Sequence, residues 1–427
     1  MFLSTLLENV LLIQSVAHSE RTGWRMISLQ GHIIVNEADL EKVIKALPLH
    51  MELTRKEPGC LTFSVSQDPV NPCLFHVEET FTCQFAFDEH QRRTAISAWA
   101  EITRSAKRCY QVSYQTQVTP RARRYDIIGA PFNQLGCYVT NQNPVEQFRQ
   151  LDDKTGLGLS QWMAIRNDRW DADINDCGDV AASSDVLDML ASDNKEQALA
   201  LYSSELQQRL LKSYQQGRVP ITIGGDHSIA VGTVQATLNF YQNQQEKRVA
   251  VIWVDAHADC NNQLASHLHG KPIALLMNEY PHNGWQIETS SALSPSDVYL
   301  IGVRDLMPAE QQLMTQWQIS HYSMDMIEQK GIYTIVDTLL THLDRHYDHI
   351  YLSFDYDALD GAQFRACATP NVGGLSAREA LYLVRAVAAH PKFVGADFVE
   401  YLPELDESGV SKELMIKLID SVWGFRQ

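Results

Sequence analysis

Three apolar runs in the second half of the chain predict strands that are buried on both faces. They are "VPITIGG" (219–225), "RVAVIWVD" (248–255) and "HIYLSFD" (349–355), all rich in β-branched and aromatic residues. Such runs are typical of a parallel sheet that helices cover on both sides. The segment "IAVGTVQATLNFY" (229–241), directly after the first run, has the pattern of a helix. We therefore expect alternating strands and helices in this part of the chain.

A different pattern occupies the front of the chain. Two amphipathic, helix-like stretches are set among four strand-like ones, in the order strand, helix, two strands, helix, strand: 26–35, 36–59, 60–81 (both middle strands), 86–106 and 108–115. This order is typical of an α+β module of the ferredoxin-like type. A chain of 427 residues is expected to hold two or three domains, which agrees with a separate front module.

Metal-capable side chains follow each of the three apolar runs. Two glycines, Gly224 and Gly225, allow a tight turn before His227, and "DAHAD" (255–259) and "DYD" (355–357) follow the other two runs. In open parallel sheets, ligands bind at the carboxyl ends of the strands. Carboxylates with imidazole suit Mn, Zn, Fe or Ni better than the soft metals. Two histidines and four aspartates are many anionic groups for one ion, so they indicate two adjacent cations, a known hydrolytic device.

The motifs "GGDHS", "DAHAD" and "SFDYDALD", in this order, resemble the ureohydrolase family of arginases, agmatinases and related amidinohydrolases. The resemblance covers residues 125–427, from "YDIIGAPF" to "GADFVEYLPELD" and onward, and implies a three-layer α/β fold with a central parallel sheet. It implies two Mn ions, with Ni, Co or Zn permitted by ligand type. Asp259 and Asp355 would be among the carboxylates that span both metals. The implied metal ligands are His227, Asp255, His257, Asp259, Asp355 and Asp357.

The resemblance also implies a mechanism and the residues that serve it. Two divalent ions lower the pKa of a bridging water, and the hydroxide attacks the planar carbon of a guanidinium. Asp259 would pass the proton to the departing amine, and Glu400 in "DFVEYLP" would hold the cationic guanidinium. His269 in "HLHGKPIALL" would shuttle protons at the mouth of the site, a task that suits a nearly neutral pKa. His267 and His282 are interpreted as ordinary polar loop residues.

The substrate tail is less closely specified. Asn261 matches an arginase residue that touches the amino-acid end of the substrate, which favours L-arginine. The loop from Asp259 to His269 is shorter than in typical arginases, and the serine expected to meet the α-carboxylate is missing or shifted to Ser266. Agmatine, guanidino acids and free guanidine stay open as substrates. A formimino substrate is less favoured because of the serine in "GGDHS".

The front module resembles the antibiotic-biosynthesis monooxygenase family through "EPGCLTFSVSQDP", "FHVEETF" and "AFDEHQRRT". His76, His90 and Trp99 are the candidates for a polar or haem-contacting role; we interpret them as structural, with His90 at a helix start and Trp99 on an apolar helix face. The module is expected to dimerise by pairing its open sheet. The expected domain boundaries are 1–25 for a flexible arm or mis-assigned start, 26–115 for this module, 116–124 for a linker and 125–427 for the catalytic domain.

Composition narrows the choice of partners. A formal net charge of −17 argues against nucleic acid and would attract a small cationic guanidino substrate. Eight cysteines without a C-x-x-C pair, Cys260 among them, indicate free thiols in a reducing compartment, so we expect the cytoplasm. No membrane span is expected, because the apolar start is short and carries Glu8.

The assembly and two other classes of function complete the hypotheses. The two resemblances imply a homo-oligomer, a trimer or a hexamer, because ureohydrolases usually form trimers or hexamers and monooxygenase-like modules usually pair. A threefold and a twofold contact in one chain would give a closed hexamer of dihedral symmetry. A non-catalytic regulatory protein and an oxygenase that acts through the front module are the alternatives from other classes. Metal content and a urea assay distinguish them.

Overall fold

The computed structural model describes residues 25–57, 59–81, 84–116, 123–140, 142–151, 156, 158–281 and 292–424. The chain divides into two compact units, Met1–Pro120 and Arg121–Gln427. Of the expected linker, only residues 116, 123 and 124 are described, and residues 116 and 124 belong to strands. Residues 1–24 and His282 lie outside the described residues. None of the helices in these ranges combines the length and the apolar character that a membrane span requires.

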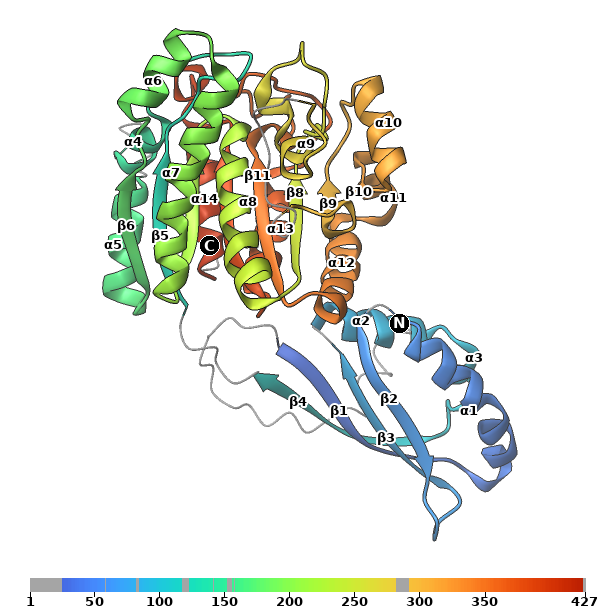
Figure 1. Cartoon of the computed structure of the whole chain (residues 1–427). Coiled ribbons are helices and arrows are strands. Elements are labelled where there is room, and N and C mark those ends of the chain that lie inside the picture. The colour runs from blue at the N-terminus through green and yellow to red at the C-terminus, as the bar shows by residue number, and fades with distance from the viewer. Residues whose placement is uncertain are drawn as a thin grey trace. The chain divides into compact units, whose positions relative to one another are not determined.

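The first unit is the predicted α+β module of ferredoxin-like type. Its four strands form an antiparallel sheet in the order β2-β3-β1-β4. Burial alternates along β3, because one face of the sheet packs against helices and the other does not. The elements are β1 (Arg25–Ile34), α1 (Leu40–Arg55), β2 (Cys60–Gln67), β3 (Leu74–Phe81), α2 (Gln84–Ala95), α3 (Ala98–Ile102) and β4 (Lys107–Thr116), seen in blue to teal in Figure 1.

Two details of this module differ from the prediction. The stretch 86–106 forms two helices instead of one, because the Ser97 side chain accepts a hydrogen bond from the Ala100 backbone N–H and begins a new helix. His90 lies within α2 and not at a helix start; its two ring nitrogens contact Glu57 Oε2 at 2.7 Å and Glu79 Oε2 at 3.2 Å. Trp99 is buried, as predicted.

The second unit contains the predicted parallel sheet. Its eight strands lie in the order β10-β9-β8-β11-β12-β7-β5-β6, and every neighbouring pair is parallel. The strands are β5 (Arg124–Ala130), β6 (Asp173–Asp179), β7 (Val219–Gly224), β8 (Val249–Val254), β9 (Val298–Ile301), β10 (Ser320–Tyr322), β11 (His349–Asp355) and β12 (Phe393–Val399). All residues of β8 and β12 are buried, as a sheet covered on both faces requires.

Helices cover both faces of this sheet and complete the three layers (Figure 1). Helices α6 to α9 line one face, and α12 to α14 line the other. The helices are α4 (Pro144–Arg149), α5 (Leu159–Trp170), α6 (Ser184–Ala191), α7 (Lys195–Gln215), α8 (Ala230–Leu238), α9 (Pro272–Leu276), α10 (Pro308–Trp317), α11 (Met324–Lys330), α12 (Ile332–His346), α13 (Ala377–Ala389) and α14 (Val410–Val422). Four neighbouring strands, β8, β11, β12 and β7, therefore end side by side in the middle of the sheet.

Candidate metal centre

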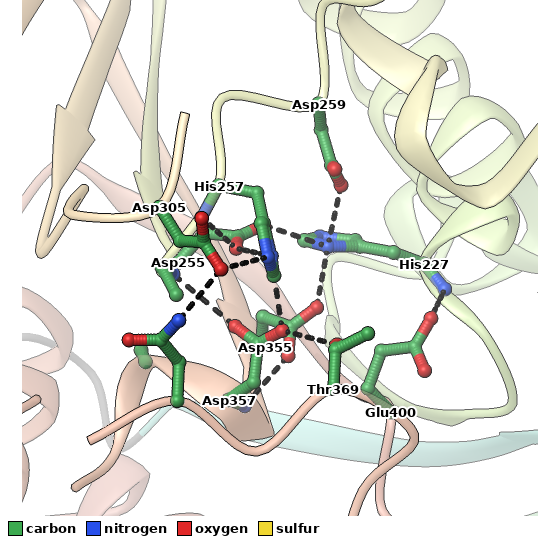
Figure 2. A network of polar contacts seen from close by, with 12 residues as sticks. His227, Asp255, His257, Asp259, Asp305, Asp355, Asp357, Thr369 and Glu400 are labelled. Carbon is green, nitrogen blue, oxygen red and sulfur yellow. Dashed lines mark hydrogen bonds and ion pairs between the residues drawn. The ribbon is translucent and has the colours of Figure 1, made fainter. Parts of the chain in front are cut away.

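The six predicted metal-binding residues converge at the carboxyl ends of β7, β8 and β11 (Figure 2). Five of the six are buried and His257 is partly exposed. Five of them form two groups whose possible ligand atoms lie within 4.8 Å of one another: His227, Asp255 and Asp259 in one group, and Asp255, His257 and Asp357 in the other.

The first group is centred on Nδ1 of His227. Three carboxylate oxygens surround this nitrogen: Asp255 Oδ2 at 3.1 Å, Asp259 Oδ2 at 2.9 Å and Asp355 Oδ2 at 2.9 Å. Nδ1 of His227 and Oδ2 of Asp259 are nevertheless buried without a hydrogen bond. Buried polar atoms are rarely left in this state, so the arrangement calls for a cation between them.

The second group is centred on His257. Its Nδ1 lies 3.1 Å from Asp357 Oδ2 and 3.4 Å from Asp255 Oδ1. The carboxylate common to both groups is therefore Asp255, whose two oxygens face the two histidines. We expect Asp259 and Asp355 to be among the carboxylates that span both metals. In the structure both contact His227 Nδ1, and neither is common to the two groups.

The electrostatics of the cluster fit a pair of divalent cations. Burial, together with the charges of Asp357 and Asp255, raises the pKa of Asp355 well above its usual value. Burial and the charge of Asp255 likewise raise the pKa of Asp259 to about 6. Carboxylates this close repel one another, and metal ions remove that repulsion by supplying positive charge between them. Oxygen and imidazole ligands suit borderline metals such as Mn, Zn or Ni.

A buried chain of hydrogen bonds orients His227. Its Nε2 lies 2.9 Å from Ser353 Oγ, and Ser353 donates its proton to Asp397. Because a serine hydroxyl has one proton, its oxygen accepts from Nε2–H, and Nδ1 keeps its lone pair for a metal. The carboxylate of Asp397, which is fully buried, also accepts hydrogen bonds from Thr233 at 2.6 Å and Tyr351 at 2.9 Å.

Three other residues support the ligands, and we did not predict them from the sequence. The Trp253 ring stacks on His227 at 4.2 Å and its Nε1 donates to Asp255 Oδ2 at 3.0 Å. Thr369 donates to Asp357 Oδ2 at 2.9 Å. Arg304 donates to the Asp357 carbonyl at 2.8 Å and to other carbonyls of the same loop. Polar residues inside apolar strands, such as Ser353 and Asp397, were the available signal for such support.

Glu400 follows β12 and faces the cluster (Figure 2). Its Oε1 accepts a hydrogen bond from the His227 backbone N–H at 2.8 Å, and its own N–H donates to the Gly225 carbonyl at 2.8 Å. Burial raises the pKa of Glu400 to about 7. Glu400 (φ 66°) and Asp259 (φ 47°) both adopt left-handed backbone conformations, which are uncommon outside glycine and cluster at functional sites.

His269 lies near Glu400 and Asp259, and it has a partner that we did not predict. Its Nε2 is 3.5 Å from the Cys137 sulfur, and its Nδ1 is 3.4 Å from the Leu135 carbonyl oxygen. Burial would lower the pKa of His269, but the contact with Cys137 and the charges of Glu400, Asp226 and Asp259 outweigh it and raise the pKa to about 10. His269 is thus favoured in its charged form.

Asn261 and Ser266, the two residues that we expect to contact the substrate tail, are hydrogen-bonded to other residues of the chain. Asn261 accepts a hydrogen bond from the Gln263 N–H at 2.9 Å, and its amide nitrogen lies 3.7 Å from Met307 Sδ. Ser266 donates to the Gln263 carbonyl at 2.9 Å and accepts from the Lys271 ammonium. These hydrogen bonds of Asn261 and Ser266 do not identify the substrate tail.

Comparisons with known proteins agree with this geometry. Residues 123–424 match the model of the arginase family, and residues 26–102 match that of the antibiotic biosynthesis monooxygenases. An arginase of Staphylococcus aureus (strain COL) is 30% identical over 318 residues, which cover 71% of this chain and 98% of that protein. The non-hepatic arginase 1 of Xenopus laevis is 36% identical over 237 residues, 51% of this chain and 63% of the relative. The arginase structure from Bacillus caldovelox, at 26% identity, superposes with a TM-score of 0.57 over 71% of this chain and 99% of that one.

Proposed function

The chain belongs to the arginase family of ureohydrolases, and from this premise we propose that it hydrolyses the C–N bond of a guanidino compound and releases urea, with L-arginine as the first candidate substrate. The observation that carries the proposal is the convergence of two imidazoles and four carboxylates at adjacent strand ends, with Glu400 beside them. The similar proteins from Staphylococcus aureus and Xenopus laevis are named arginases, which supports L-arginine as the substrate.

The proposed metal ligands are the six residues of the cluster, and the proposed metals are two Mn²⁺, with Ni²⁺, Co²⁺ or Zn²⁺ also compatible with the ligand types. Such a pair, when bound, supplies a water of lowered pKa as the nucleophile. The chain contributes the shape of the site: Asp255 faces both groups, and Ser353 fixes which nitrogen of His227 is offered to the metal.

Glu400 is proposed to hold the guanidinium. One of its oxygens is fixed by the His227 backbone N–H, which leaves the other oxygen to pair with the substrate. A guanidinium is a planar fork of donors and forms short, strong hydrogen bonds with a carboxylate. A cationic substrate would favour the ionised form of Glu400, whose pKa burial has raised to about 7.

Two residues are proposed to move protons. Asp259, whose pKa burial and the charge of Asp255 raise to about 6, can take a proton from the attacking water and pass it to the departing amine nitrogen. His269 has a proton to give from Nε2 and can protonate the amine as it leaves the site.

Agmatine is the second candidate substrate, and the state of Ser266 favours it. Arginine carries an α-carboxylate that requires donors, whereas the Ser266 hydroxyl is held by the Gln263 carbonyl and the Lys271 ammonium. A guanidino compound without a carboxylate would need no such contact.

The test is a panel of substrates on protein loaded with Mn²⁺. L-arginine, agmatine, 4-guanidinobutyrate and guanidine would be scored for urea, and N-formimino-L-glutamate for formamide. Asp355→Asn should abolish product and lower bound metal, whereas Asp348→Asn should not, because Asp348 lies before the opposite end of β11. Absence of product from every compound, with two ions bound per chain, would refute the proposal.

A further inference from the structure

The loop after β5 (Arg124–Ala130) brings a cysteine to the predicted proton-shuttling histidine. The Leu135 N–H donates to Asp226 Oδ2 at 2.9 Å, which fixes the loop beside the turn after β7 (Val219–Gly224). The next residue, Gly136, lies beside the ring of His269, and the sulfur of Cys137 lies 3.5 Å from its Nε2. Two segments 132 residues apart in the sequence thus meet at one ring.

The contacts of His269 assign its protons. The Leu135 carbonyl, 3.4 Å from Nδ1, can only accept a hydrogen bond, so Nδ1 carries a proton. Nε2 is then the nitrogen that faces the Cys137 sulfur at 3.5 Å. A thiol proton transferred to Nε2 leaves a thiolate beside an imidazolium, the pairing that activates cysteines in proteins.

The charges around the pair favour this transfer. The hydrogen bond from His269 lowers the pKa of the Cys137 thiol, although burial and the charge of Glu400 oppose it. Glu400 and Asp226 both stabilise the imidazolium form of His269. Cys137 is also exposed, so small molecules can reach its sulfur.

We propose that Cys137 is a modification site beside the candidate metal centre, where His269 holds its sulfur as a thiolate that reacts with small uncharged electrophiles such as hydrogen peroxide. The thiolate attacks one peroxide oxygen and the O–O bond breaks. The sulfur is oxidised to a sulfenic acid, and the leaving hydroxide takes the proton of the His269 imidazolium and departs as water. Because His269 then loses both its charge and its thiolate partner, oxidation of Cys137 should also lower urea release; this consequence rests on the proposed function.

The test measures the rate of modification at each cysteine, which does not depend on catalysis. The full-length, Mn²⁺-loaded protein is treated with iodoacetamide at pH 6.5, and the modified cysteines are counted by mass spectrometry. Cys109 is the internal control, because it is exposed and lies on a strand of the other unit. A thiol of ordinary pKa is about 1% thiolate at this pH, so Cys137 should react at least about 10-fold faster than Cys109. Equal rates would overturn the proposal.

A variant tests the role of the imidazole. In His269→Asn, the rate at Cys137 should fall to that of Cys109, while the rate at Cys109 stays the same. An unchanged rate at Cys137 would show that His269 does not activate the thiol. If the variant does not fold, the pH dependence of the wild-type rate still decides: the rate at Cys137 should level off at a lower pH than the rate at Cys109.

Hydrogen peroxide tests the natural reaction class. Peroxide should form a sulfenic acid at Cys137 that dithiothreitol reverses, and urea release should fall and recover in parallel. Cys109→Ser should behave like the wild type in both respects. Modification of Cys137 without loss of urea release would refute only the proposed effect of oxidation on catalysis. The absence of urea release before treatment would refute the proposed function, and the alkylation rates would still test whether Cys137 is an activated thiol.

Discussion

Removal of one hydroxyl group, in Ser353→Ala, should weaken metal binding although Ser353 is not a proposed metal ligand. Ser353 Oγ lies 2.9 Å from His227 Nε2 and donates its own proton to Asp397. Alanine removes the acceptor for Nε2–H and one of the donors to the buried Asp397 carboxylate. His227 is then free to place its proton on Nδ1, the nitrogen that three carboxylates surround.

The size of the effect follows from the loss of these two contacts. Removing the hydrogen-bond partner of a metal-ligating histidine costs about 10- to 100-fold in metal affinity, or roughly 1.4–2.8 kcal/mol. A buried donor left without a partner costs a further ~1–3 kcal/mol of folding free energy in the metal-free protein. Ser353 and Asp397 are both fully buried, so water should not replace the lost hydroxyl.

The assay is a titration of the metal-free protein with Mn²⁺, followed by calorimetry, together with chemical unfolding of the same samples. Ser203→Ala is the matched control. Ser203 is also buried in this unit, on α7 (Lys195–Gln215), but its hydroxyl has no hydrogen-bond partner. Its loss should therefore leave the affinity for Mn²⁺ unchanged and should not lower the free energy of unfolding. If Ser353→Ala bound Mn²⁺ within twofold of the wild type, Ser353 would not orient His227 for metal binding.

Three further predictions concern other parts of the chain. Glu400→Gln should keep both metals but lose most turnover, because a neutral amide pairs poorly with a guanidinium; unchanged turnover in the urea assay would rule out this role. Burial, with help from nearby cationic groups, lowers the pKa of His50 to about 3, so His50 stays neutral in the folded state while the unfolded chain protonates it below about 6.5. Its contribution to stability is therefore present above pH 6.5 and lost as the pH falls toward 3. The variant His50→Phe, which keeps a ring against Trp99, should make the free energy of unfolding depend less on pH between pH 6.5 and 5. An identical pH dependence of wild type and variant in urea titrations would contradict this. Asp420→Ala should lower the free energy of unfolding by about 3–5 kcal/mol, because it removes the carboxylate that lies 2.9 Å from Nε of the buried Arg166 guanidinium. A decrease below about 1 kcal/mol in the same titrations would show that this ion pair contributes little to stability.

The sequence by itself determined the features that depend on neighbouring residues. An apolar, β-branched run predicts a buried strand, and the residues that follow it lie at that strand's carboxyl end whatever the rest of the chain does. For this reason His227, Asp255, His257, Asp259, Asp355 and Asp357 were identifiable as candidate metal ligands, and the order of strands and helices at the front predicted a ferredoxin-like module.

Only the tertiary structure decided which of these residues face one another. The strand order places β8, β11, β12 and β7 side by side. As a result, Asp255 rather than Asp259 is the carboxylate common to the His227 and His257 groups. The same order brings Asp397 next to Ser353 and Glu400 next to His227. The left-handed backbone at Glu400 is maintained by contacts with residues far away in the sequence, such as Gly225. Cys137 and His269 meet only because two loops fold over the same strand ends. Contacts between distant segments depend on how the whole sheet packs, and no local pattern of residues encodes them.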